Sequence, residues 1–68
     1  MFGKMLKEAR KSYFKTQKQF AKIVNVPLGT YKSWEAGITY PNNENMIKLG
    51  EILEPEIYNK MHSVWIKR

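Results

Sequence analysis

Residues 16–37 read TQKQFAKIVNVPLGTYKSWEAG, and this stretch decides the fold of the chain. Thr16 can cap the start of a helix, because Gln19 follows three residues later, at the spacing of a capping box. The apolar face that follows at helical spacing consists of Phe20, Ala21, Ile23 and Val24. Asn25 comes next and tolerates the left-handed backbone conformation that ends a helix sharply. The first half of the stretch therefore predicts one short helix.

A second short helix is expected from about Leu28 to Ala36, because Tyr31 and Trp34 stand three residues apart on its inner face. Gly37 is placed to end this helix, since glycine readily adopts the left-handed conformation. Two short helices joined by a tight turn form a helix-turn-helix. Such a pair can insert its second helix into the major groove of DNA.

A longer pattern extends beyond the motif on both sides. Inside the motif it comprises Gln17, Phe20, Ala21, Val26, Tyr31, Trp34, Glu35 and Gly37. Outside the motif it comprises Leu6, Ala9, Arg10, Pro41, Met46, Leu49 and Leu53. In this spacing the chain resembles the phage Cro/repressor (Xre-type) helix-turn-helix family over roughly residues 4–53. The resemblance implies an all-α fold, a small bundle of four to five helices of the lambda-repressor-like type.

Helical spacing of apolar residues predicts the remaining elements. A helix is expected from about Gly3 to Tyr13, and Asn42 or Asn43 is expected to cap another after the loop 38–41. The first of these buries Met5, Leu6 and Ala9, and the other carries Met46, Ile47, Leu49, Ile52 and Leu53. Gly50 costs the later helix up to about 1 kcal/mol, which a close helix contact would explain.

The tail, residues 54–68, has two readings. Pro55 suits the first position of a helix, whose apolar face would comprise Ile57, Met61, Val64 and Trp65. Residues 62–66 are also rich in β-branched and aromatic side chains, which favours a strand. In either case Val64, Trp65 and Ile66 should cover the core or meet a second copy of the chain.

Length and composition narrow the class of protein. A chain of 68 residues is expected to form one domain, residues 1–68, and the absence of cysteine excludes disulfides and thiolate chemistry. No apolar run reaches the length of a membrane span. The net charge is +6, and residues 1–22 hold seven basic residues against Glu8 alone. This basic third favours a polyanionic partner, with double-stranded DNA the best candidate beside a helix-turn-helix.

The expected DNA contacts fall into two groups. Base edges would meet the outer face of the second motif helix, through Leu28, Gly29, Thr30, Lys32 and Ser33, with Thr30 turned partly inward. Phosphates would meet helix starts and the following loop, through Thr16, Gln17, Lys18, Thr39, Tyr40, Asn42 and Asn43. Leu28 and Gly29 stand where well-known relatives have long polar residues, so direct base reading is thin and DNA shape should contribute. The resemblance further implies a buried ion pair between Arg10 and Glu35.

The resulting hypothesis is a minimal, cytoplasmic, phage- or bacteria-encoded transcriptional regulator that binds a two-fold operator as a homodimer. The tail, residues 54–68, is a candidate for the dimer contact. The alternative is a protein-binding antirepressor or antitoxin-like module on the same fold, with weak or no DNA binding. It would hold a co-encoded repressor or toxin through the exposed Leu28-Gly29 pair, with Trp65 and its neighbours as a second apolar surface. An enzyme, a metal site or a cofactor is not expected, because His62 is the only histidine and has no companion ligands. No membrane partner is expected, since the apolar positions of the first helix match the core of the family.

Overall fold

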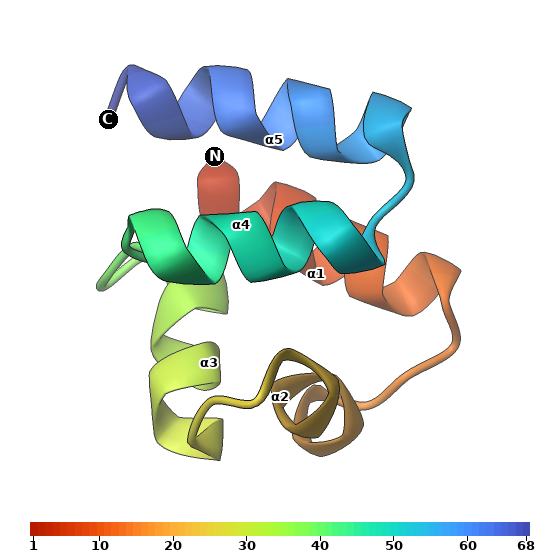
Figure 1. Ribbon diagram of the computed structural model, residues 1–68. Coiled ribbons are helices and arrows are strands. Elements are labelled where there is room, and N and C mark those ends of the chain that lie inside the picture. Colours follow the sequence, from red (N-terminus) through yellow and green to blue (C-terminus); the bar gives the residue numbers. More distant parts are fainter.

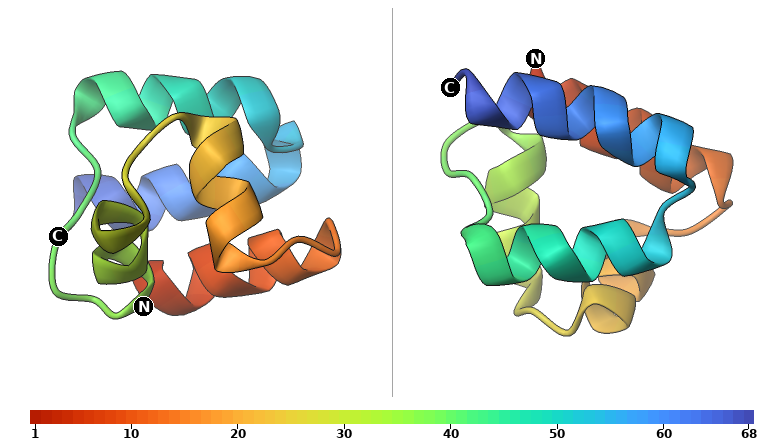
Figure 2. Two further views of the ribbon diagram at one scale, coloured as in Figure 1. Left: turned by 90° about the horizontal axis from the view of Figure 1, so that it is seen from below. Right: turned by 45° about the horizontal axis from the view of Figure 1, so that its top comes forward.

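A computed structural model describes residues 1–68 as five α-helices without a strand. They are α1 (Phe2–Ser12), α2 (Gln17–Val24), α3 (Leu28–Glu35), α4 (Asn43–Ile52) and α5 (Pro55–Ile66). Helices α2 and α3 form the lower part of the molecule in Figure 1, and α5 lies at the top, beyond α1 and α4. Seen from below, α1 and α4 flank the α2–α3 pair on opposite sides (Figure 2). None of the five helices is both long enough and apolar enough to cross a bilayer.

The predicted start of α2 is confirmed in detail. The Thr16 hydroxyl accepts a hydrogen bond from the Gln19 amide at 3.1 Å, and the Gln19 side chain accepts one from the Thr16 amide at 2.9 Å. These two reciprocal bonds satisfy donors that the start of a helix otherwise leaves unpaired. The cap fixes where the chain turns into α2.

Three successive helices end in the same way, with one left-handed residue and a hydrogen bond that spans six residues. The left-handed residues are Phe14 (φ 57°), Asn25 (φ 65°) and Gly37 (φ 77°). The closing bonds run from the amides of Lys15, Val26 and Ile38 to the carbonyls of Arg10, Ala21 and Ser33. This is the Schellman arrangement, which pairs carbonyls at a helix end and reverses the chain direction. Asn25 and Gly37 were predicted to act in this way, whereas Phe14 was not.

The core contains thirteen buried apolar side chains contributed by every helix. The largest of them are Trp34, Tyr31, Phe2 and Phe20, each exposed by no more than 2%. The expectation that the apolar faces of α2 and α4 include Ile23 and Ile47 is wrong for burial, because Ile23 is 46% exposed and Ile47 is 62% exposed. Both lie at the edge of an apolar stripe, where the packing of neighbouring helices decides whether a side chain is covered.

The tail forms a helix, and this resolves the two readings of residues 54–68. Pro55 occupies the first turn of α5, and Trp65 turns inward with only 8% exposure. The indole nitrogen of Trp65 donates to the Pro41 carbonyl at 2.8 Å, which ties α5 to the loop after α3. Ile66 on the outer side is 60% exposed, so the tail covers the core with one face and offers an apolar residue on the other.

Two glycines mark places where helices approach closely. A Cβ atom on Gly50 would lie 3.1 Å from the Tyr58 ring, which confirms the predicted helix contact. Gly3 is buried more tightly, because a Cβ atom there would meet the Glu35 carbonyl oxygen and would lie 2.7 Å from the Trp34 carbonyl oxygen. Backbone atoms cannot rotate away as side chains do, so α1 approaches the end of α3 this closely only with glycine at position 3.

We expect Gly3→Ala to lower the free energy of unfolding by about 1–3 kcal/mol, because the added methyl group forces α1 away from α3. Thermal unfolding followed by circular dichroism measures this change. Gly29→Ala is the matched control, since a Cβ atom there meets nothing within 4 Å and alanine favours a helix. Equal melting temperatures for the two variants would contradict the close approach.

Candidate nucleic-acid interface

The outer face of α3 presents a short row of exposed residues. Gly29, Thr30 and Lys32 are exposed, and Ser33 is half-buried. Two expectations are wrong here: Thr30 is not turned inward, and Leu28 is half-buried because it packs partly against the core. The freely exposed part of this face is therefore polar rather than apolar.

Ser33 is held by the loop that follows α3. The hydroxyl groups of Thr39 and Ser33 share a hydrogen bond at 2.8 Å. This bond restricts the Ser33 side chain and leaves one hydroxyl proton of the pair available for another acceptor. The two residues are therefore linked, and the loop after α3 is held against that helix.

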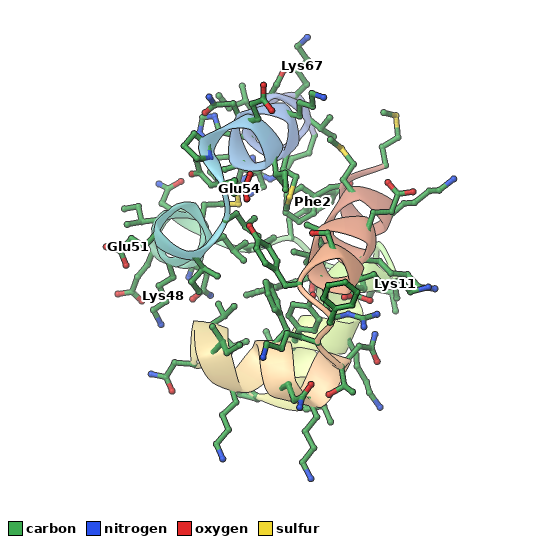
Figure 3. All side chains as sticks on the ribbon, turned by 90° about the vertical axis from the view of Figure 1, so that its right-hand side faces the viewer. Phe2, Lys11, Lys48, Glu51, Glu54 and Lys67 are labelled. Atoms are coloured by element: carbon green, nitrogen blue, oxygen red, sulfur yellow. The ribbon has the colours of Figure 1, made fainter.

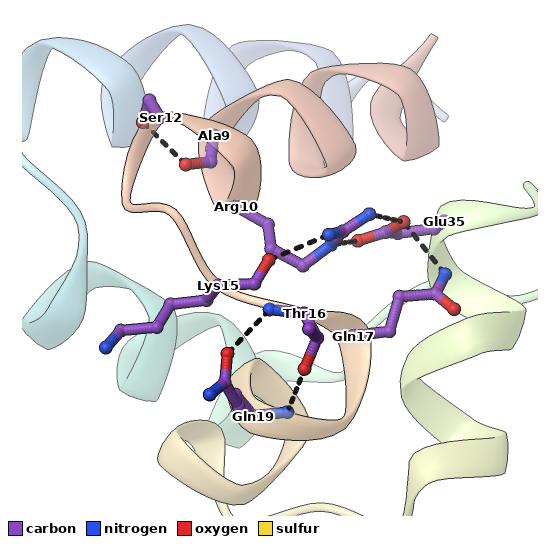
Figure 4. A network of polar contacts seen from close by, with 8 residues as sticks. All are labelled: Ala9, Arg10, Ser12, Lys15, Thr16, Gln17, Gln19 and Glu35. Carbon is purple, nitrogen blue, oxygen red and sulfur yellow. Dashed lines mark hydrogen bonds and ion pairs between the residues drawn. The ribbon is translucent and has the colours of Figure 1, made fainter.

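The start of α2 combines free backbone donors with polar side chains. The amides of Gln17 and Lys18 have no acceptor in the chain, because the Thr16 side chain serves the amide of Gln19. The side-chain nitrogen Nε2 of Gln17 donates one proton to Glu35 at 3.0 Å and keeps a second proton (Figure 4). Unpaired amides at a helix start are a favourable environment for an anion.

An ion pair joins α1 to the end of α3. Arg10 donates through Nε to Glu35 at 2.7 Å and through Nη2 at 3.2 Å, a bidentate arrangement. Its Nη1 donates to the Lys15 carbonyl at 2.8 Å, just before α2 (Figure 4). The side chains are 10% exposed for Arg10 and 3% for Glu35. Together with the hydrogen bond from Gln17, the ion pair connects α1, α2 and α3 at one carboxylate.

This network shifts the pKa values of Glu35 and Tyr31. Burial alone raises the pKa of Glu35, but hydrogen bonds from Arg10 and Gln17 and the nearby Tyr31 hydroxyl outweigh it and hold the pKa below its ordinary value. The Tyr31 hydroxyl is buried without a hydrogen-bond partner of standard geometry. Burial, and then the Glu35 carboxylate, raise the pKa of Tyr31 well above that of free tyrosine. All three groups stay in one charge state near neutral pH.

The start of α4 offers a second set of donors. The Asn42 side chain caps the helix by accepting from the Asn45 amide at 2.9 Å. The amides of Asn43 and Glu44 have no acceptor in the chain. Tyr40 is 43% exposed and packs its ring 5.8 Å from that of Phe2. Asn42 therefore has a structural role, while Asn43 and Tyr40 remain accessible.

Lys7 was not among the expected site residues, yet it lies at this surface. It lines a shallow depression with Gln17, Lys32, Glu35 and Ala36, so three helices contribute to one patch. The signal in the sequence is its position on the same side of α1 as Gly3 and Arg10, both of which contact α3. The surface around Lys32 and Gln17 consequently includes a cation from α1.

We expect Arg10→Ala to lower the free energy of unfolding by on the order of 3 kcal/mol, because it leaves Glu35 buried without its partner. Lys4→Ala, which removes the same charge from an exposed position of α1, is the control.

The pKa of Glu35 is lower in the folded state than in the unfolded state. The pair therefore stabilises the fold above the unfolded-state pKa, and this stabilisation is lost as pH falls through the folded-state pKa. Chemical denaturation from pH 7 downward checks both effects, and an Arg10→Ala melting temperature equal to that of the wild type excludes a stabilising role for the pair.

Comparisons with known proteins identify the family of this chain. A family model described as helix-turn-helix matches residues 6–54. The chain is also 38% identical over 52 residues to the cryptic phage CTXphi transcriptional repressor RstR of Vibrio cholerae serotype O1, a match that covers 76% of this chain. The chain spans about half the length of that relative, 46%. No solved structure matches. The matched residues contain α2, α3 and the network that holds them, and the chain belongs to the Xre-type helix-turn-helix family.

Proposed function

We propose that this protein is a sequence-specific DNA-binding transcriptional regulator, which binds a two-fold operator as a dimer with α3 in the major groove. One observation carries the proposal: Lys32 on the exposed face of α3 lines the same depression as Gln17, whose helix start has free amides. Base-reading and phosphate-binding groups are thus side by side. Membership of a family that includes a phage transcriptional repressor supports the regulatory role.

Phosphate binding would set affinity and orientation. The amides of Gln17 and Lys18 would hold one backbone phosphate, with the second amide proton of Gln17 pointing to the same oxygen atoms. The amide of Asn43, with Tyr40 nearby, would hold another. Lys18 would add charge at the first site. Two anchored helix starts would fix the angle at which α3 enters the groove.

Base reading would rest on few residues. Lys32 can donate to guanine O6 or N7, and Ser33 and Thr30 can bond several bases. Gly29 has no side chain, so the α3 backbone can approach the base edges there. Leu28 can touch a thymine methyl group only with the part of its side chain that the core leaves free. Sequence-dependent DNA shape would supply the remaining specificity.

A dimer is proposed because one copy is too small to read a full operator. The longest extent of the chain is 26 Å, whereas half-sites one helical turn apart are separated by about 34 Å. Three of the exposed large apolar residues lie in the α3–α4 loop or next to the chain termini. They are Ile38, exposed by 76%, Met1 by 87% and Ile66 by 60%. A second copy would cover such residues.

The alternative role, capture of a co-encoded repressor or toxin, has less support. It was motivated by an apolar Leu28 exposed at the head of α3, and Leu28 is half-buried against the core. The rest of the α3 surface is polar and suits base edges better than an apolar partner.

A binding-site selection from random duplex DNA, followed by titration of the selected duplexes across salt concentrations, tests the proposal. A recovered two-fold consensus and a steep fall of log affinity with log salt are expected. The absence of any enriched sequence would reject sequence-specific binding and favour the protein-binding alternative, which affinity capture against co-encoded proteins would then examine.

We expect Gln17→Ala to weaken binding to every duplex by a similar factor, roughly tenfold or more, because a hydrogen bond to a charged phosphate is lost. The ranking of sequences should not change. Dissociation constants at fixed salt measure the effect, and the melting temperature shows how much stability the lost bond to Glu35 contributed. Asn59→Ala on α5 serves as the control. Unchanged dissociation constants would remove Gln17 from the phosphate site.

We expect Lys32→Ala to relax base preference at one position in each half-site, by about 1–3 kcal/mol between the preferred base and the others. Lysine contacts to guanine edges carry information that a phosphate contact does not. Repeating the selection with the variant measures this, with Lys48→Ala on α4 as the charge-matched control. An identical consensus from the variant would restrict Lys32 to a phosphate or surface role.

A further inference from the structure

Three lysines of α1 form a row along one side of that helix. Lys4, Lys7 and Lys11 follow at intervals of three and four residues, which places them on a common face. All three are exposed, and none has an acidic partner within salt-bridge distance. We refer to these three residues as the α1 lysine row. Its positive charge is not used inside the chain.

The α1 lysine row lies beside the proposed DNA interface. Lys7 shares a shallow depression with Gln17 and Lys32. Lys4, Lys7 and Lys11 line an adjoining depression, together with Glu8 and Glu35. Lys7 and Glu35 belong to both depressions, so the two are continuous. The surface that starts at Gln17 therefore extends along the length of α1.

The close packing of α1 on α3 makes this continuity possible. Gly3 allows the α1 backbone to approach the carbonyl groups of Trp34 and Glu35 with no side chain between them. The ion pair from Arg10 holds the same two helices together about two turns further along α1. As a result, α1 is a rigid edge of the α3 surface.

The charge around the row favours an anionic partner. Two carboxylates lie nearby, and Glu35 is neutralised by its bidentate pair with Arg10. Glu8 is the remaining acidic group against three lysines. All four other acidic side chains are carried by α4, by the residue before α5 and by the first turn of α5, at Glu44, Glu51, Glu54 and Glu56. Figure 3 shows Lys11 on one side of the molecule and Glu51 on the opposite side.

We propose that the α1 lysine row is a second phosphate track, which binds consecutive backbone phosphates next to the phosphate held by Gln17. This inference rests on the proposed function, because it assigns further contacts to the same DNA complex. The lysine side chains of the track are exposed, and no acidic partner holds them in a fixed orientation. Its lysines would neutralise charge without reading sequence, and their effect would appear as salt dependence and not as base preference.

The test compares two triple variants of equal charge. The track variant replaces all three lysines of the row by glutamine: Lys4→Gln, Lys7→Gln and Lys11→Gln. The control variant replaces one lysine of α4, one of α5 and the residue after α5: Lys48→Gln, Lys60→Gln and Lys67→Gln. Figure 3 places Lys48 and Lys67 away from Lys11. Glutamine keeps helix propensity close to that of lysine, so both variants should fold. The probe is a duplex obtained from the binding-site selection, titrated between 50 and roughly 300 mM salt, the range over which counterion release is marked.

For the track variant we expect the slope of log affinity against log salt to fall by about 0.9 for each lost phosphate contact, or about 2.7 per protomer. The consensus should not change, and the control variant should keep the slope of the wild type. Lys7→Gln alone should remove about one third of the effect. Circular dichroism of each variant shows that the comparison is made between folded proteins.

Equal slopes for the track variant and the wild type would overturn the inference, and equal losses in the two triple variants would reduce it to a general effect of net charge. In both cases the wild type still binds its consensus, so the proposed function survives. A wild type without salt-dependent duplex binding would instead overturn the proposed function, and the phosphate track with it.

Discussion

The arrangement of this fold depends on the ion pair between Arg10 and Glu35, because it joins three helices at one point. Arg10 comes from α1, Glu35 ends α3, and Gln17 at the start of α2 completes the network through the same carboxylate. Burying these two charges costs free energy, which offsets much of their attraction, so the main contribution of the pair is to specify geometry. A bidentate contact has one favourable orientation, so it restricts how α1 can lie against the end of α3.

That constraint has a consequence for the surface. Because Gln17 donates one side-chain amide proton to Glu35, the orientation of this amide is restricted, and its second proton has no acceptor in the chain. The free amides at the start of α2 are fixed by the Thr16 capping box. A preorganised donor loses less conformational entropy on binding a phosphate than a mobile side chain does. The internal network and the proposed DNA contact are therefore parts of one structure.

Local sequence signals predicted the elements well where a specific atom does the work. Thr16 and Gln19 announce the start of α2, and Gly37 announces the end of α3 by its tolerance of a positive φ. Phe14 adopts the same left-handed conformation without any local preference for it, because the hydrogen bonds of Phe14 and Lys15 to the end of α1 require it there. Its 93% exposed ring shows that packing of the side chain is not the reason.

What the sequence determined by itself is the set of helices, their caps and the family pattern, since these depend on residues that are neighbours along the chain. The tertiary structure alone decided which borderline apolar residues are covered, leaving Ile23 and Ile47 outside and Leu28 partly inside. It also showed the tail to be a helix, which the bond from Trp65 to Pro41 ties to the loop after α3. Above all it brought Lys7 beside Gln17 and Lys32. Such neighbours arise from contacts between helices, which no spacing within a single helix contains.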